Sequence, residues 1–216
     1  MVNPGKEDSR VKTAESSDDH TKITGAENNY KAKRWFYGTL AWLAVLLIGI
    51  AVIVIIVDPY FHYHKPLSFL SYRIYEERYV NDGISRHFTY DAVITGTSMS
   101  QNFKTSELDE LFGTQSVKEP FSGAGFKELS ESLDRTLQYG QEVKMVVMPL
   151  DYNALLQDAD WEKYEEYPTY LYDNNIFNDT RYVWNKAIFY HGAVADLLRT
   201  ISGEPTTTMD EYSAWV

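Results

Sequence analysis

The stretch that decides the fold is Tyr90-Asp91-Ala92-Val93-Ile94-Thr95-Gly96-Thr97-Ser98-Met99-Ser100-Gln101-Asn102-Phe103. It predicts a short buried strand, Ala92 to Thr95, that leads directly into a tight turn carrying Ser98. A strand, a glycine, an exposed serine and then a helix can present a nucleophile at the carboxyl end of a parallel strand. The same residues are also typical of a helix cap, because Gly-Thr-Ser is a common way to leave a strand. Both interpretations follow from this stretch.

Strands and helices alternate downstream of this stretch. The pattern predicts a short helix over 105–112, a strand over 116–121, an amphipathic helix over 126–139 and an apolar strand over 144–149 that is covered on both faces. Alternation at this spacing indicates βαβ units, and therefore a parallel sheet with helices on both faces. The expected fold class is α/β, with a three-layer parallel sheet.

The rest of the domain is less regular. We expect a helix over 67–80, a turn at Asn81-Asp82-Gly83 and another helix over 180–200. Residues 154–179 are acidic and rich in tyrosine. They predict either a solvated insertion packed on the domain or a surface that binds a sugar polymer or a cationic ligand.

Residues 35–57 contain 23 residues without a charge. At about 1.5 Å per residue, a helix of this length crosses a hydrocarbon core of roughly 30 Å. Trp35, Phe36, Tyr37 and Trp42 lie near one end, as an interfacial aromatic belt would. A cleavable signal peptide is the alternative, but its apolar region is shorter and ends in small residues, whereas this run ends in Ile-Ile-Val-Asp-Pro. We therefore expect an uncleaved transmembrane anchor.

Charge divides the chain around this anchor. Residues 1–34 carry a net charge of +1 and few large apolar residues, which predicts a disordered tail. Lys31, Lys33 and Arg34 precede the anchor, so the positive-inside rule places the tail in the cytoplasm. Residues 58–216 then form an extracellular domain with a net charge of −12. The expected location is the cell membrane, with a single pass through the lipid bilayer.

Composition excludes several classes of function. The net charge of −11 argues against nucleic-acid binding, which needs a basic surface. The chain has no cysteine, which excludes disulfides, thiolate metal sites and a cysteine nucleophile. His62 and His64 could share one face of a strand and bind a metal, but without a nearby carboxylate they favour interfacial packing. No metal or other cofactor is expected.

Three loops leave the carboxyl ends of the three predicted strands, at Gly96-Thr97-Ser98-Met99, Phe121-Ser122-Gly123 and Leu150-Asp151-Tyr152-Asn153. In an open parallel sheet these ends meet at one crevice. A hydroxyl group, backbone N–H groups beside small residues and a side-chain amide are the components of an acyl-transfer site.

The order of these three blocks resembles that of the SGNH, or GDSL-like, hydrolase superfamily, over about residues 88–155. The resemblance implies that Ser98 is the nucleophile. It implies an oxyanion hole made by the Ser98 and Gly123 N–H groups and the Asn153 amide. With the anchor, the chain is similar to membrane-bound members that modify bacterial envelope polymers. The implied activity is that of an esterase or acyltransferase on cell-envelope glycopolymers.

The chain departs from the family pattern. Thr97 replaces an acidic residue, Asp151 replaces a glycine, and the terminal Asp/His block has no counterpart. Without a base, a serine hydroxyl is a weak nucleophile. We therefore expect the sequence to be the N-terminal part of a longer SGNH-like domain. The alternative is a non-catalytic, anchored binding or scaffold protein of an envelope-assembly complex, whose partner is a polysaccharide or a membrane acyltransferase.

Overall fold

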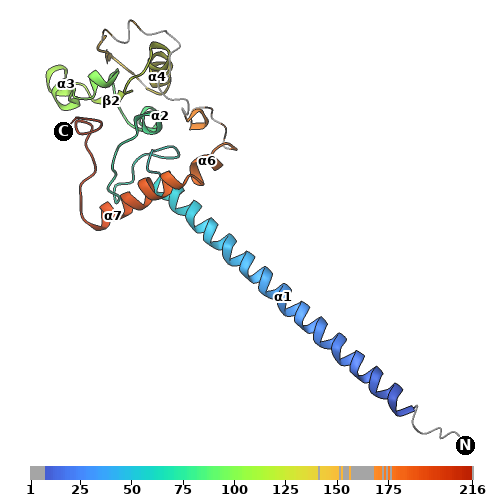
Figure 1. Cartoon of the computed structure of the whole chain (residues 1–216). Coiled ribbons are helices and arrows are strands. Elements are labelled where there is room, and N and C mark those ends of the chain that lie inside the picture. The colour runs from blue at the N-terminus through green and yellow to red at the C-terminus, as the bar shows by residue number, and fades with distance from the viewer. Residues whose placement is uncertain are drawn as a thin grey trace, which may run out of the picture. The chain divides into compact units, whose positions relative to one another are not determined.

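The computed structural model describes residues 8–140, 142–150, 152, 156, 168–171, 173, 175 and 177–215, and side chains only from residue 29 onward. The chain divides into two compact units, residues 1–49 and residues 50–216 (Figure 1). The first unit is helical, and the second contains the sheet together with the last turns of the long helix. The fold is therefore mixed α/β with one apolar helix near the N-terminus.

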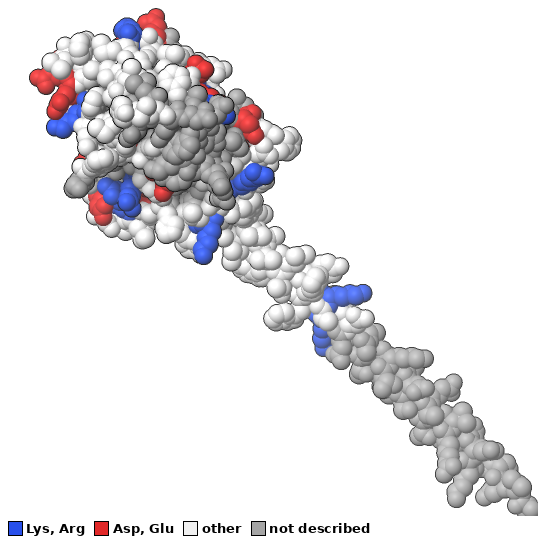
Figure 2. All heavy atoms as spheres, turned by 45° about the horizontal axis from the view of Figure 1, so that its top comes forward, with Lys and Arg blue, Asp and Glu red and all other residues white. Residues whose placement is uncertain are grey.

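Helix α1 runs from Asp8 to Val57. Its part Asn29–Val57 is long and apolar enough to cross a membrane, and only 11% of its most apolar stretch is buried. A core helix of a soluble domain would be mostly buried, so this exposure fits a single-pass anchor. Figure 2 shows a length of this helix without charged side chains. The structure extends the helix back through residues predicted to be disordered, because each residue added to an existing helix gains a hydrogen bond without a new nucleus.

A parallel sheet of three strands follows the predicted alternation. Strands β1 (Ala92–Gly96), β2 (Ser116–Pro120) and β3 (Met145–Val147) lie in the order β2-β1-β3. Both neighbours pair with β1 in parallel, with Val93 opposite Val117 and Val146. The prediction of a parallel sheet is confirmed, and β1 is its central strand.

Two predicted helices have the expected bounds. Helix α3 spans Thr105–Phe112 and helix α4 spans Phe126–Tyr139. Gly113 ends α3 in the left-handed conformation, with φ of 66°, which glycine adopts without the steric cost of a side chain. These boundaries follow from local sequence, because the apolar spacing and the terminal glycines are signals that need no tertiary partner.

Helix α2 corrects two expectations. It spans Glu77–His87, later than the predicted helix over 67–80, and passes through the predicted turn at Asn81-Asp82-Gly83. All three of these residues are buried. A Cβ atom at Gly83 would lie 2.2 Å from the carbonyl oxygen of Tyr60, so the glycine serves close approach rather than a turn. The Asn81 amide donates to the Pro120 carbonyl at 2.8 Å and so joins α2 to β2.

The two faces of β2 have different neighbours. Glu119 points to α2 and α4, where Ser85 and Thr136 hydrogen-bond its carboxylate. Successive side chains of a strand point to opposite faces, and Lys118 accordingly hydrogen-bonds the carbonyls of Gln101 and Asp210. Strand β3 was predicted to be covered on both faces, but Val146 is 39% exposed. At Val146 one face of this strand is therefore only partly covered.

The C-terminal third is broken into short helices: η2 (Thr169–Leu171), α6 (Thr180–Val183), the π-helical η3 (Ile188–Val194) and α7 (Ala195–Ile201). The predicted helix over 180–200 is interrupted near Asn185, whose side chain accepts from the Ala187 N–H and starts the second part. Most of the acidic segment 154–179 lies outside the described residues, so neither interpretation of it is tested.

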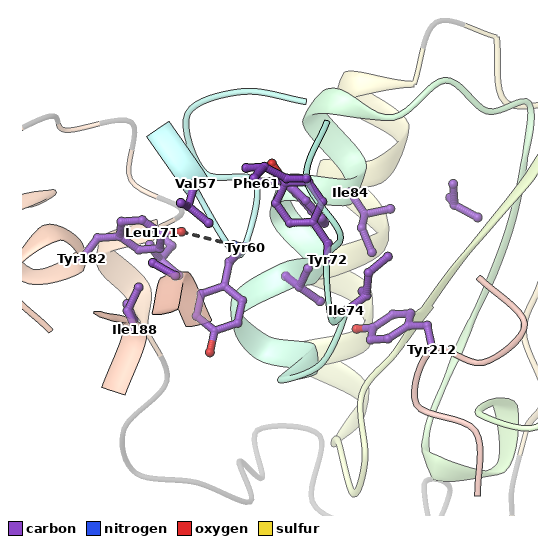
Figure 3. Packing of buried hydrophobic residues seen from close by; sticks show 14 of the residues in the cluster. Val57, Tyr60, Phe61, Tyr72, Ile74, Ile84, Leu171, Tyr182, Ile188 and Tyr212 are labelled. Carbon is purple, nitrogen blue, oxygen red and sulfur yellow. Dashed lines mark hydrogen bonds between the residues drawn. The ribbon is translucent and has the colours of Figure 1, made fainter. Parts of the chain in front are cut away.

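The main hydrophobic core lies between α2, the segment that follows α1, and the C-terminal helices. Figure 3 shows Phe61 and Tyr72 between Val57 and Ile84, and Tyr60 beside Ile188 and Tyr182 from the C-terminal third. The rings of Phe61 and Tyr72 meet edge to face with centroids 5.1 Å apart. This core joins parts of the sequence more than 100 residues apart.

Asp58, the residue after α1, is a buried hydrogen-bond acceptor at one side of this core. Its carboxylate accepts hydrogen bonds from the N–H groups of His62, Tyr63 and His64 at 2.7–3.0 Å, and from the Tyr182 hydroxyl at 2.8 Å. Asp58 itself has a left-handed φ of 46°. Burial raises the pKa of the carboxyl group, and these four donors oppose that rise. The residue therefore ends the helix and closes the next turn.

Replacing Tyr182 with phenylalanine tests this arrangement. The hydroxyl donates to Asp58 and accepts from the Tyr60 N–H at 3.2 Å, so its removal leaves two buried polar groups short of a partner. We expect Tyr182→Phe to lower the free energy of unfolding by about 1–3 kcal/mol. Chemical unfolding of the full chain in detergent micelles measures this. Tyr190→Phe, at an exposed tyrosine, is the control, and equal effects of the two changes would contradict the assignment.

Candidate functional site

Ser98 lies at the carboxyl end of the central strand. Gly96 ends β1 with φ of 133°, and Ser98–Ser100 form a single 3-10 turn, η1. The Ser98 side chain is partly exposed. Among the described residues, no hydrogen bond involves its hydroxyl group. The position predicted for a nucleophile therefore carries a hydroxyl at the sheet edge that no described residue engages.

The cap in this turn is Thr97 rather than Ser98. The Thr97 hydroxyl accepts from the Met99 N–H at 3.4 Å, and the Ser100 hydroxyl donates to the Thr97 carbonyl at 2.8 Å. Two of the three hydroxyl groups in the turn thus stabilise the backbone locally. This assigns the capping role to a neighbour, so capping does not explain the serine at position 98.

The second loop lies directly beside the first. The Phe121 N–H donates to the Gly96 carbonyl at 2.8 Å, which joins the ends of β1 and β2. Gly123 follows with a left-handed φ of 68°. In the described residues its N–H group makes no hydrogen bond. The structure therefore brings the Ser98 turn and Gly123 to the same edge of the sheet.

The third loop is only partly described. A Cβ atom at Gly96 would lie 3.2 Å from the Pro149 Cδ atom, so the chain after β3 contacts the end of β1. Leu150 and Tyr152 are exposed. Asn153, the predicted third oxyanion donor, lies outside the described residues, as does Asp151. Its predicted role is therefore not tested.

Glu77, at the start of α2, was not identified from the sequence. One of its carboxylate oxygens accepts from the Ser122 N–H at 2.6 Å, and the other accepts from the Gln101 side-chain amide. The Gln101 oxygen in turn accepts from the Trp215 indole N–H. This Glu77 network (Ser122, Glu77, Gln101 and Trp215) joins the two loops to α2 and to the C-terminal segment.

A cavity of about 530 Å³ opens beside this network. Its lining residues come from the start of α2, the second loop and the C-terminal third: Tyr75, Glu76, Glu77, Arg78, Tyr79, Ser122, Pro168 and Ser213. Glu76 and Ser213 both have left-handed φ values, of 60° and 55°. Non-glycine residues held in this conformation are often found at binding sites. Ser98 does not line this cavity.

No described acid or base is hydrogen-bonded to Ser98. The His62 ring lies 3.1 Å from Asp179, and the His64 ring contacts the carbonyls of Ile55 and Lys65. His87 lines a cavity of about 450 Å³ with Asp91 and Lys144, which precede β1 and β3, so it lies at the opposite edge of the sheet. His62 and His64 therefore have separate partners. The described residues contain no group of three metal-binding side chains.

Two buried charges lie on β2 behind the site. Burial lowers the pKa of Lys118 to about 8, opposed by Asp210 and Glu77. Burial raises the pKa of Glu119 to about 7, opposed by hydrogen bonds from Thr136 at 2.5 Å and Ser85 at 2.8 Å. The sequence-based expectation of a strand here overlooked both residues. A Lys-Glu pair between Val117 and Pro120 gives no local sign of burial.

The chain was compared with protein-family models, with curated proteins and with solved structures. No family model matches it, and the searches of curated proteins and of solved structures return no match. The assignment of function therefore depends on the geometry of the site and on the anchor.

The raised pKa of Glu119 predicts a pH-dependent stability. Its folded-state pKa of about 7 exceeds the ordinary value of 4.5, so the folded state holds the proton more tightly. Protonated Glu119 therefore contributes to the free energy of unfolding. This contribution is fully present below about pH 4.5 and is lost as the pH rises through about 7. Glu119→Gln should flatten the fall in the urea midpoint of the full chain between about pH 5 and 8. Glu107→Gln, at an exposed carboxylate, is the control, and parallel pH profiles of wild type and Glu119→Gln would refute the prediction.

Proposed function

We propose that the protein is a membrane-anchored, SGNH-like serine esterase or acyltransferase that acts on cell-envelope glycopolymers. The observation that carries the proposal is the strand order β2-β1-β3. This order places the Ser98 turn between the loops that follow β2 and β3, where a parallel sheet holds its ligands. In the described part of the chain, the Ser98 hydroxyl and the Gly123 N–H have no hydrogen-bond partner, which supports the roles of nucleophile and oxyanion donor.

The proposed chemistry is acyl transfer through a covalent intermediate. The Ser98 oxygen attacks the carbonyl carbon of an ester, the bond to the leaving alcohol breaks, and the serine proton ends on that alcohol. The Gly123 N–H, together with the predicted Ser98 N–H and Asn153 amide, stabilises the oxyanion that develops. Water or a polymer hydroxyl then releases the acyl group. The base that accepts the serine proton is not among the partners of Ser98 in the described residues.

A serine-directed probe tests this chemistry. We expect a fluorophosphonate to label the full-length wild-type protein at Ser98, because the probe reacts with an activated serine hydroxyl. Ser98→Ala should remove the label, and Ser130→Ala, at an exposed position on α4, should keep it. Equal labelling of wild type and Ser98→Ala, or no labelling of either, would remove the enzymatic proposal.

The second candidate is a non-catalytic, anchored binding or scaffold protein of an envelope-assembly complex. It is favoured by the absence of a hydrogen-bonded acid or base at Ser98 in the described part of the chain. Binding does not need an activated serine. Capture of envelope polysaccharide or of a membrane acyltransferase to the same extent by wild type and Ser98→Ala, without probe labelling, would support this function over the first.

The proposed orientation predicts which residues are accessible from outside the cell. Because the chain has no cysteine, a single introduced cysteine gives a unique label. In intact cells we expect a membrane-impermeant maleimide to label Ser130→Cys and not Ser17→Cys, since Lys31, Lys33 and Arg34 favour a cytoplasmic N-terminus. Permeabilised cells should show both labels. The reverse pattern in intact cells would refute the proposed topology.

A further inference from the structure

We propose that Glu77 is a positioning residue that holds the loops of Ser98 and Gly123 in register, an inference that rests on the proposed function. Its two carboxylate oxygens each serve one loop. One accepts from the Ser122 N–H at 2.6 Å, directly before Gly123 in the chain. The other accepts from the Gln101 amide, which follows the Ser98 turn. Glu77 therefore bridges the two loops and need not touch the substrate.

The directions of the hydrogen bonds explain why a carboxylate is needed at this position. The Ser122 N–H can only donate, and so can the Trp215 indole N–H. Gln101 uses its oxygen to accept from Trp215, which leaves its NH₂ group to face Glu77. Residue 77 must therefore accept twice. A carboxylate accepts with both oxygens, whereas a glutamine has only one oxygen and would turn an NH₂ group toward a second donor.

The surroundings hold Glu77 in this position. It is the first residue of α2, directly after Glu76 in its left-handed conformation, so its backbone is fixed by the start of the helix. The Gln101 carbonyl accepts from Lys118 Nζ at 2.7 Å, which places a buried cation close to the network. Arg78, the next residue, is paired with Glu128 at 2.6 Å. The Arg78 guanidinium also donates to the Ser122 carbonyl at 3.2 Å, so both residues at the start of α2 hold the second loop.

These bond directions predict a rescue. In Glu77→Gln, the NH₂ group of the new amide faces the NH₂ group of Gln101, and neither can accept. In Gln101→Glu, the new carboxylate faces the carboxylate of Glu77, and neither can donate. The double variant Glu77→Gln/Gln101→Glu restores every bond. The new amide at position 77 accepts from Ser122 and donates to the new carboxylate at position 101, which also accepts from Trp215. The net charge equals that of the wild type. A role in packing alone would not be restored by exchanging the two groups.

The experiment compares five full-length proteins in detergent micelles: wild type, the two single variants, the double variant and Glu131→Gln, which changes an exposed carboxylate on α4 away from the Glu77 network. Hydrogen exchange at the Ser122 amide should be faster in each single variant and return to the wild-type rate in the double variant. Fluorophosphonate labelling of Ser98 should slow by about tenfold or more in each single variant and recover in the double variant. Glu131→Gln should match wild type in both measurements.

The two measurements separate the two proposals. A wild type without labelling overturns the proposed chemistry, and the exchange rates then decide the bridge between the loops by themselves. Unchanged exchange in Glu77→Gln, or a double variant no better than the single ones, overturns the role of Glu77. If hydrogen exchange changes in Glu77→Gln but the rate of Ser98 labelling does not, Glu77 bridges the loops without positioning the nucleophile. That result also overturns the proposal.

Discussion

The carboxylate of Asp58 is the constraint on which the rest of the domain depends. Three backbone N–H groups and the Tyr182 hydroxyl converge on it, so the chain leaves the apolar helix through a closed turn. That turn sets the path of Tyr60 and Phe61, whose carbonyls lie against α2 at Gly83. Helix α2 in turn carries Glu77 to the loops after β1 and β2. A single buried acceptor is therefore connected, contact by contact, to the candidate site.

Several buried side chains of α2 are polar and form hydrogen bonds to other elements. Asn81 joins the helix to Pro120 and Tyr212, and Ser85 donates to Glu119. A buried polar group is costly unless it is hydrogen-bonded, so such contacts tolerate few alternative arrangements. The apolar core favours compaction, whereas these bonds select which residues of α2 face the sheet. The position of Glu77 at the sheet edge follows from that selection.

The candidate site shows how far local reasoning extends. The place of Ser98 and Gly123 at one edge of the sheet could be predicted, because a strand end followed by a small-residue turn is a local signal and parallel strands bring such ends together. Glu77 could not be predicted, because it lies in a stretch without a strand signal and meets the loops only through α2. The distinction between the Thr97 cap and the Ser98 hydroxyl was also beyond the sequence. Both are hydroxyl residues, and only backbone geometry separates them.

The sequence by itself determined the apolar helix that fits an anchor, the alternation of strands and helices, and the bounds of α3 and α4. Each depends on the spacing of apolar residues or on a terminal glycine, which act over a few residues. Only the tertiary structure decided the strand order, the burial of Lys118 and Glu119, and the helical conformation of Asn81-Asp82-Gly83. Locally these three residues favour a turn. Burial of all three residues and the long-range hydrogen bond from Asn81 to the Pro120 carbonyl stabilise a helix instead, and together they outweigh a local preference of about 1 kcal/mol per residue.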